Sequence, residues 1–256
     1  MNRLQAELRR LYRLGSLEDE GNRSEDFGLI SPDGGVRAMV LELARPADWT
    51  VLSTLWQGVQ VDLELPAPAI AVSGIDGYQL WFSLSDPVPV VEARSFLESL
   101  RLRYLGNIAP GRVAMRPSVE ASVSGPGQHA KMVPALWAET GRWSAFIAPD
   151  LAAVFSDEPW LDICPSPDAQ ADILSRMVSI KAEDFQMVLG RLSAEAKTAP
   201  SHMALAANER GGSKSDLDPK RFLLDVMGDK TIELHLRIQA AQALLPYFES
   251  RPRSVT

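Results

Sequence analysis

The chain has 256 residues, of which 46% are hydrophobic and 23% are charged, so it can bury the core of one large domain or two small ones. Its formal net charge of -7 and pI near 5.1 exclude an indiscriminate nucleic-acid binder, because nonspecific phosphate binding needs clustered Lys and Arg. A local basic face is still compatible with this charge.

Cysteine usage and hydropathy set further limits. Cys164 is the only cysteine, which excludes a disulfide framework and a thiolate metal site and fits a reducing compartment. No apolar run approaches the roughly 20 residues of a membrane span. The N-terminal segment lacks the continuous apolar centre of a secretion signal. We therefore expect a cytoplasmic protein with no membrane association.

Composition divides the chain into four segments: an N-terminal helix and connection (1–35), an α+β domain (36–196), a linker (197–219) and a C-terminal helical segment (220–256). The first segment begins with an amphipathic pattern over 3–14, typical of a docking helix. The linker is predicted from its Gly- and Ser-containing centre, and the last segment regains the periodicity of a helical hairpin.

The pattern between residues 36 and 118 alternates between strand and helix. Strands are predicted at 36–43, 69–73, 78–84 and 112–116. One helix is expected from about 46 to 62, and Asp86 and Pro87 are expected to open the second. The β-α-β-β-α-β order predicts an α+β fold with a ferredoxin-like, or RRM-like, four-stranded antiparallel sheet. Added strands at 143–147 and 161–163 and one or two helices over 167–192 complete the domain.

The segment VQVDLEL at 59–65 has two interpretations. As a strand it would place Asp62 and Glu64 on one face, as a carboxylate pair for a metal ion. We favour the helix, because the upstream helical spacing runs into this segment and Pro66 and Pro68 end it.

The most informative stretch is PAIAVSGIDGYQLWFSL, from Pro68 to Leu84. It predicts two strands joined by a tight turn around Gly74 and Gly77. Alternation in the second strand puts Gln79, Trp81 and Ser83 on one face. Three roles are open for this face: it is a catalytic surface, it binds a ligand, or it packs against another layer of the fold.

Two motifs in this region carry a family resemblance. SGIDGYQLWFSL is similar to a strand-turn-strand segment in which a Ser-Gly pair and a Gly-aromatic-His or Gly-aromatic-Gln run precede an aromatic residue. IAPGRVAMRPS is similar to a later segment in which an acidic residue precedes an Arg-rich strand that ends in Pro. Through these motifs, about a third of the chain resembles archaeo-eukaryotic primase-polymerases, most closely the RepB-like plasmid and phage primase branch.

The resemblance implies a replication role in a mobile element and assigns degenerate catalytic positions to Glu42, Gln79 and Asn107. Glu42 is followed by Ala44 where the family has a second carboxylate, and Asn107 stands at the third acidic position. Two-metal nucleotidyl transfer needs several carboxylates, so we expect no metal site and no cofactor, with Mg²⁺ or Mn²⁺ needed only by an active enzyme.

Four residues are candidates for nucleic-acid binding. Arg112 and Arg116 are expected to share a sheet face and suit phosphate, whereas Tyr78 and Trp81 could stack on bases. The alternatives are salt-bridged arginines and core aromatics. His129, His202 and His235 are isolated, and no nucleophile elbow or P-loop occurs, which excludes zinc, hydrolase and P-loop chemistry.

Three hypotheses follow. The first is a primase-like protein with lost or altered nucleotidyltransferase activity that binds single-stranded nucleic acid or a replication protein. The second is a non-enzymatic interaction or assembly factor that uses the sheet as a scaffold. The third is a divergent active DNA primase that uses Glu42 with Asp62 or Glu64. A converging set of Glu42, Asp62, Gln79 and Asn107 would favour an active site.

Overall fold

The computed structural model describes residues 2–12, 26–31, 33–118, 129–208 and 241. The chain divides into one compact unit from Met1 to Ser201 and a second from His202 to Thr256. The fold described below is that of the first unit. Apart from residue 241, the predicted C-terminal segment 220–256 lies outside the described residues.

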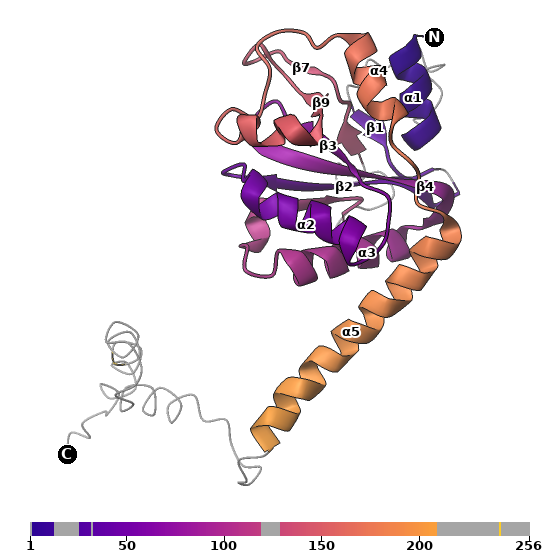
Figure 1. Cartoon of the computed structure of the whole chain (residues 1–256), viewed down its shortest axis with the longest axis vertical. Coiled ribbons are helices and arrows are strands. Elements are labelled where there is room, and N and C mark those ends of the chain that lie inside the picture. The colour runs from indigo at the N-terminus through magenta and orange to yellow at the C-terminus, as the bar shows by residue number, and fades with distance from the viewer. Residues whose placement is uncertain (1, 13–25, 32, 119–128, 209–240, 242–256) are drawn as a thin grey trace, which may run out of the picture. The chain divides into compact units, whose positions relative to one another are not determined.

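A five-stranded antiparallel sheet forms the centre of the first unit (Figure 1). Its strands lie in the order β5-β2-β4-β3-β9. Their bounds are β2 (Gly35–Ala44), β3 (Ala69–Val72), β4 (Gly77–Pro89), β5 (Val113–Arg116) and β9 (Ala145–Ile147). The α+β class and the first four strands are confirmed. The predicted four-stranded sheet has a fifth strand, because β9, which falls within the added strand predicted at 143–147, pairs with β3.

Two helices cover one face of this sheet: α2 (Trp49–Val61) and α3 (Val90–Tyr104). The side chain of Asp48 begins α2 by accepting a hydrogen bond from the Val51 amide at 3.0 Å. Because α2 runs to Val61, the alternative strand at 59–65 is wrong. Asp62 and Glu64 therefore form no carboxylate pair on a strand.

Helices α1 (Arg3–Tyr12) and α4 (Pro167–Ser175) lie against the opposite face (Figure 1). The apolar side of α1 is buried through Leu4, Leu8, Leu11 and Tyr12. The Arg10 guanidinium donates to the carbonyls at the end of α4, those of Leu174 and Met177. The sheet is therefore enclosed by a second helical layer as well as the first.

The alternation predicted for β4 separates two apolar clusters. Tyr78, Leu80, Phe82 and Leu84 join the cluster beneath α2 and α3. Trp81 joins the other cluster, beneath α1 and α4, together with small side chains on the neighbouring strands, namely Ala38, Ala69 and Ala71. These alanines let α1 approach the sheet closely. The face that carries Gln79, Trp81 and Ser83 is therefore a second core rather than an open surface.

Helix α3 begins later than predicted. Asp86 and Pro87 belong to β4, because Val88 and Pro89 still pair with the start of β2 after a bulge, and the helix starts at Val90. The predicted strand at 161–163 is reduced to a single bridge between Trp143 and Leu161.

The remaining elements are short, except for α5. The short ones are β1 (Asp26–Gly28), β6 (His129–Lys131), β7 (Leu136–Trp137), β8 (Arg142–Trp143) and the 3₁₀ helices η1 (Pro110–Arg112) and η3 (Pro149–Phe155). Strand β1 pairs with β6, and β7 pairs with β8. Helix α5 (Ala182–Asn208) extends into the segment 197–219 that the sequence predicts as a linker.

A glutamine side chain satisfies the outer edge of β9. The buried Gln170 amide accepts a hydrogen bond from Phe146 N–H at 2.7 Å and donates one to Phe146 C=O at 2.9 Å. It thus imitates a neighbouring strand at this position. The same contacts hold α4 against the strand whose Phe146 packs on Trp81.

Replacing Gln170 with Leu should lower the free energy of unfolding by about 2–4 kcal/mol, because two buried backbone groups lose their partners. The exposed Gln57 on α2 supplies a matched control, and Gln57→Leu should change stability by less than about 0.5 kcal/mol. Urea unfolding followed by circular dichroism measures both values. Equal effects of the two substitutions would contradict this assignment.

Candidate functional site on the sheet

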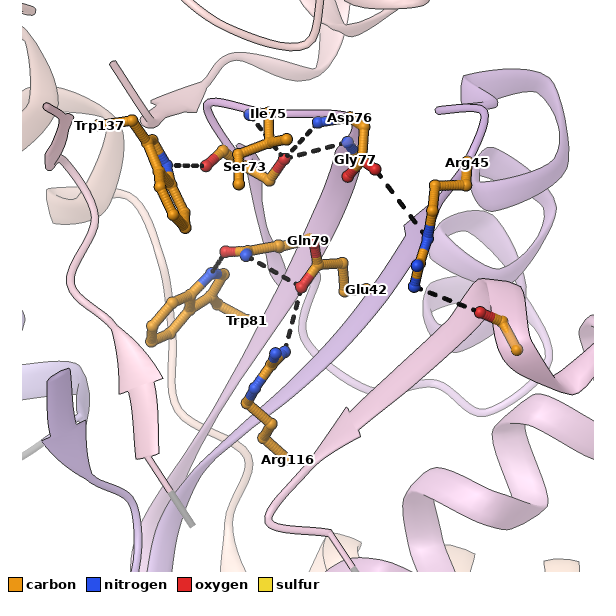
Figure 2. Close-up of polar contacts among 11 residues, drawn as sticks. Glu42, Arg45, Ser73, Ile75, Asp76, Gly77, Gln79, Trp81, Arg116 and Trp137 are labelled. Carbon is orange, nitrogen blue, oxygen red and sulfur yellow. Dashed lines mark hydrogen bonds and ion pairs between the residues drawn. The ribbon is translucent and has the colours of Figure 1, made fainter. Parts of the chain in front are cut away.

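Four of the predicted site residues form one hydrogen-bonded polar cluster (Figure 2). We call it the Glu42 cluster; its members are Glu42, Gln79, Trp81 and Arg116. Glu42 lies on β2, opposite Gln79 on β4 and Ala114 on β5. Strand alternation directs these side chains to the face that α1 and α4 cover.

Hydrogen bonds join the cluster into a chain. Glu42 Oε2 accepts from Arg116 Nη1 at 3.0 Å and from Gln79 Nε2 at 3.3 Å. The indole N–H of Trp81 donates to Gln79 Oε1 at 2.9 Å. Because the indole can only donate, this bond fixes the Gln79 amide with its nitrogen toward Glu42. Every polar group on the Gln79 amide has a partner, as buried polar groups require.

The charge of the Glu42 cluster is compensated internally. The Glu42 side chain is only 15% exposed and that of Arg116 31% exposed, so their ion pair is partly shielded from water. A carboxylate that is already paired with a guanidinium is a poor ligand for Mg²⁺, which prefers several oxygens in octahedral geometry. In the described part of the chain, no group of three His, Cys, Asp or Glu side chains could hold a metal ion.

The third degenerate position does not join this cluster. Asn107 is exposed in the turn between α3 and η1, and no hydrogen bond among the described residues connects it to Glu42 or Gln79. Asp62 lies at the end of α2, in the layer on the other side of the sheet. The converging set of four residues that would favour an active site is therefore not formed.

Arg112 does not share a strand with Arg116 as predicted. It ends η1, and its guanidinium donates to the carbonyls of Ala44 and Pro46 at 3.3 and 2.9 Å. The prediction failed because the Pro110–Gly111 dipeptide forms a 3₁₀ turn before β5 begins. Arg112 thus binds backbone carbonyls at the end of β2, whereas Arg116 forms an ion pair with Glu42.

The two aromatic candidates are buried. Trp81 is 2% exposed and packs against the rings of Tyr12 and Phe146, with centroids 5.3 and 5.8 Å away. Tyr78 is fully buried on the other face, and its hydroxyl donates to the Ala152 carbonyl at 2.6 Å. Base stacking needs an open ring face, so neither ring can serve as a stacking platform in this structure.

The SGIDG turn is organised by its serine. Ser73 Oγ accepts hydrogen bonds from the amides of Ile75, Asp76 and Gly77 at 3.0 to 3.2 Å (Figure 2). Gly74 has φ of +83° and lies against the Trp137 ring, so a side chain there would be strained and would clash. The Ser-Gly pair therefore builds the hairpin, and its hydroxyl is engaged with the backbone.

Sequence reasoning missed Arg45 at the end of β2. Its φ of 57° is unusual for a non-glycine residue, and its side chain is 72% exposed. Its guanidinium reaches the Asp76 carboxylate at 4.0 Å and the Gly111 carbonyl at 3.5 Å, so it spans two loops (Figure 2). The only signal in the sequence is the Arg-Pro dipeptide after the strand, which marks a turn but no partner.

The acidic residues considered for metal binding have other partners or none nearby. Asp62 accepts a hydrogen bond from the Tyr104 hydroxyl at 3.0 Å and lies 3.9 Å from Arg103. Burial, together with this hydrogen bond to Asp62, raises the pKa of Tyr104 to about 12. Glu64 is exposed with a positive φ of 55°. Asp62 thus stabilises the packing of α3 on α2.

No protein-family model matches this chain, and no curated protein matches it. Within the described residues, none of the helices has the length and apolar character needed to cross a membrane.

We expect Arg116→Met and Glu42→Gln each to lower the free energy of unfolding by about 1–3 kcal/mol, because each leaves its partner half-buried without a hydrogen bond to the opposite charge. The double variant should cost less than the sum, since the residues interact directly. Arg9→Met, at an exposed position on α1, is the control and should be near neutral. Additive losses in urea unfolding would show that the pair is not coupled.

Because the pKa of the Tyr104 hydroxyl is raised, we expect the protein to lose stability at alkaline pH. This pKa is raised from 10.0 to about 12, so the stabilising contribution of the hydroxyl is complete below pH 10 and is lost as the pH rises toward 12. Tyr104→Phe should reduce this loss across that range, as measured by unfolding at each pH. Asp62→Asn should retain most of the raised pKa in a phenolate absorbance titration, because burial is the larger cause. An unchanged pH dependence in Tyr104→Phe would contradict this account.

Proposed function

We propose that this chain is a non-enzymatic protein-interaction or assembly factor, in which a ferredoxin-like sheet serves as a scaffold. The element order β2-α2-β3-β4-α3-β5 and the strand order β5-β2-β4-β3 support the ferredoxin-like core. Strand β9 and the helices α1 and α4 are additions to that core. A fold of this kind hosts many functions, so the function is set by the residues of the site.

The burial of Trp81 carries the proposal. An RRM-like sheet binds nucleic acid by stacking bases on exposed aromatic rings of the sheet surface. Here Trp81 lies beneath Tyr12 of α1 and beside Phe146 of β9. Removing α1 to free the ring would expose four buried apolar side chains, each contributing about 1.5–3 kcal/mol when buried. This cost favours a sheet that is permanently covered.

The Glu42 cluster supports the same conclusion for catalysis. Glu42 would be the carboxylate of a nucleotidyltransferase site, yet Arg116 neutralises it and Gln79 fills the next hydrogen-bonding position. The third hypothesis requires Asp62 or Glu64 beside Glu42. Because Asp62 ends α2 in the layer beneath the opposite face, a shared metal ion would require a different arrangement of the strands and α2.

One observation favours a second candidate, a degenerate primase-like protein of the RepB-like branch that binds single-stranded nucleic acid or a replication protein. Glu42 and Gln79, two positions of the resembling motifs, do lie on neighbouring strands and in contact. Such a protein would have to bind nucleic acid through Arg45, Arg112 and Arg116 at the strand ends, without base stacking on Trp81.

Fluorescence anisotropy with labelled single-stranded DNA and RNA separates these candidates. For the proposed function we expect no binding at tens of micromolar protein and low salt, conditions that detect even nonspecific nucleic-acid binders. We also expect no template-dependent primer synthesis with Mg²⁺ or Mn²⁺. Single-strand binding whose salt dependence is flattened by Arg112→Ala with Arg116→Ala would instead establish the second candidate. Metal-dependent nucleotide incorporation lost in Glu42→Ala would establish an enzyme.

A further inference from the structure

The outer surface of η3 presents two large apolar side chains to solvent. Leu151 is 52% exposed and Val154 is 74% exposed. A 3₁₀ helix has three residues per turn, so residues three apart lie in line, and Leu151 and Val154 form a ridge about 6 Å long. Ser156 keeps helical backbone angles, which carries the line toward Asp157. We call Leu151 and Val154 the η3 ridge.

The η3 ridge is held rigidly by the sheet beneath it. Ala152 is fully buried between the ridge residues, and its carbonyl accepts the hydrogen bond from the Tyr78 hydroxyl. The segment after η3 is fixed as well, because Pro159 C=O accepts from the Gly74 amide at 3.0 Å. A surface that is already ordered loses little conformational entropy when a partner binds. The exposed side chains are therefore arranged in advance for contact.

Carboxylates flank this apolar ridge. Asp150, Asp157 and Glu158 are exposed beside it. Among the described residues, none of these three carboxylates forms an ion pair. The surface therefore combines an apolar centre with uncompensated negative charge at its rim.

We propose that the η3 ridge is a docking surface for a basic amphipathic helix of a protein partner. Side chains four residues apart on an α-helix are about 6 Å apart along its axis, which matches the spacing of Leu151 and Val154. Lys or Arg beside the apolar stripe of that helix would face Asp157 and Glu158. This inference rests on the proposed function and identifies the surface and the class of partner that would serve it.

Charge complementarity selects this occupant over three others. A second copy of the chain carries the same acidic rim and a net charge of -7, so the two surfaces would repel each other. Nucleic acid and anionic membranes are repelled for the same reason. A basic segment gains binding free energy both from burying the apolar ridge and from pairing its charges with the carboxylates that form no ion pair.

The test uses the full chain and a labelled synthetic helix made of Leu and Lys, with Leu at helical spacing. A scrambled peptide of identical composition is the first control. We expect the Leu151→Ser, Val154→Ser variant to bind the helix about tenfold more weakly. The matched control is Val91→Ser, Leu102→Ser, which removes an equally exposed pair from α3 and should bind like the unaltered chain. Circular dichroism confirms that both variants are folded.

The charge arm compares two variants that change the net charge equally. Asp157→Asn with Glu158→Gln should weaken binding and flatten its salt dependence, whereas Glu139→Gln with Glu183→Gln should leave both unchanged. The proposal would be overturned if the helix and its scrambled control bound equally well, or if the paired variants had equal effects. It would also be overturned if the helix did not bind. Self-association lost with Leu151→Ser, Val154→Ser in sedimentation would also overturn it, in favour of a second copy.

These outcomes are independent of the test of the proposed function. Suppose that the chain binds no nucleic acid and that the Leu151→Ser, Val154→Ser variant binds the peptide as well as the unaltered chain does. This result would refute docking at the η3 ridge but would leave the proposed scaffold function intact. Conversely, single-strand binding or primer synthesis would refute the scaffold function whatever the peptide binds.

Discussion

The packing of α1 across the sheet onto Trp81 is the constraint on which the functional interpretation depends. Tyr12 of α1 and Phe146 of β9 enclose the indole, whose N–H is satisfied by Gln79. The small residues beneath α1 allow this close approach, and Gln170 holds β9 and α4 in register with it. This face of the sheet is thereby part of the interior.

This second layer also sets the electrostatics of the Glu42 cluster. A carboxylate beside a covered face needs a partner, because burial of an unpaired charge is expensive. Arg116 and Gln79 supply that partner and leave little capacity for a metal ion. Apolar and charged groups that are exposed to other molecules lie elsewhere, including on η3, where Leu151 and Val154 are exposed near Asp157 and Glu158.

Much of the fold was predictable because local patterns decided it. Alternation in β4 and the Gly-rich turn defined a hairpin, and the helical spacing before Val61 defined α2. One error arose from pairing between distant segments, and another from a local turn. Pro89 continues β4 because Gly35 pairs with it, and Arg112 leaves the strand because a turn begins at Pro110. For the site, the contact of Glu42 with Gln79 followed from neighbouring strands, whereas the position of Asn107 depended on a turn.

The sequence by itself determined which side chains of each strand share a face, since alternation along a strand is a local property of the backbone. It placed Gln79 and Trp81 together and identified Tyr78 as belonging to the other side. Only the tertiary structure decided what covers each face, because α1 and Phe146 come from segments far apart in the sequence and no local pattern specifies their docking. That decision made Trp81 a core residue.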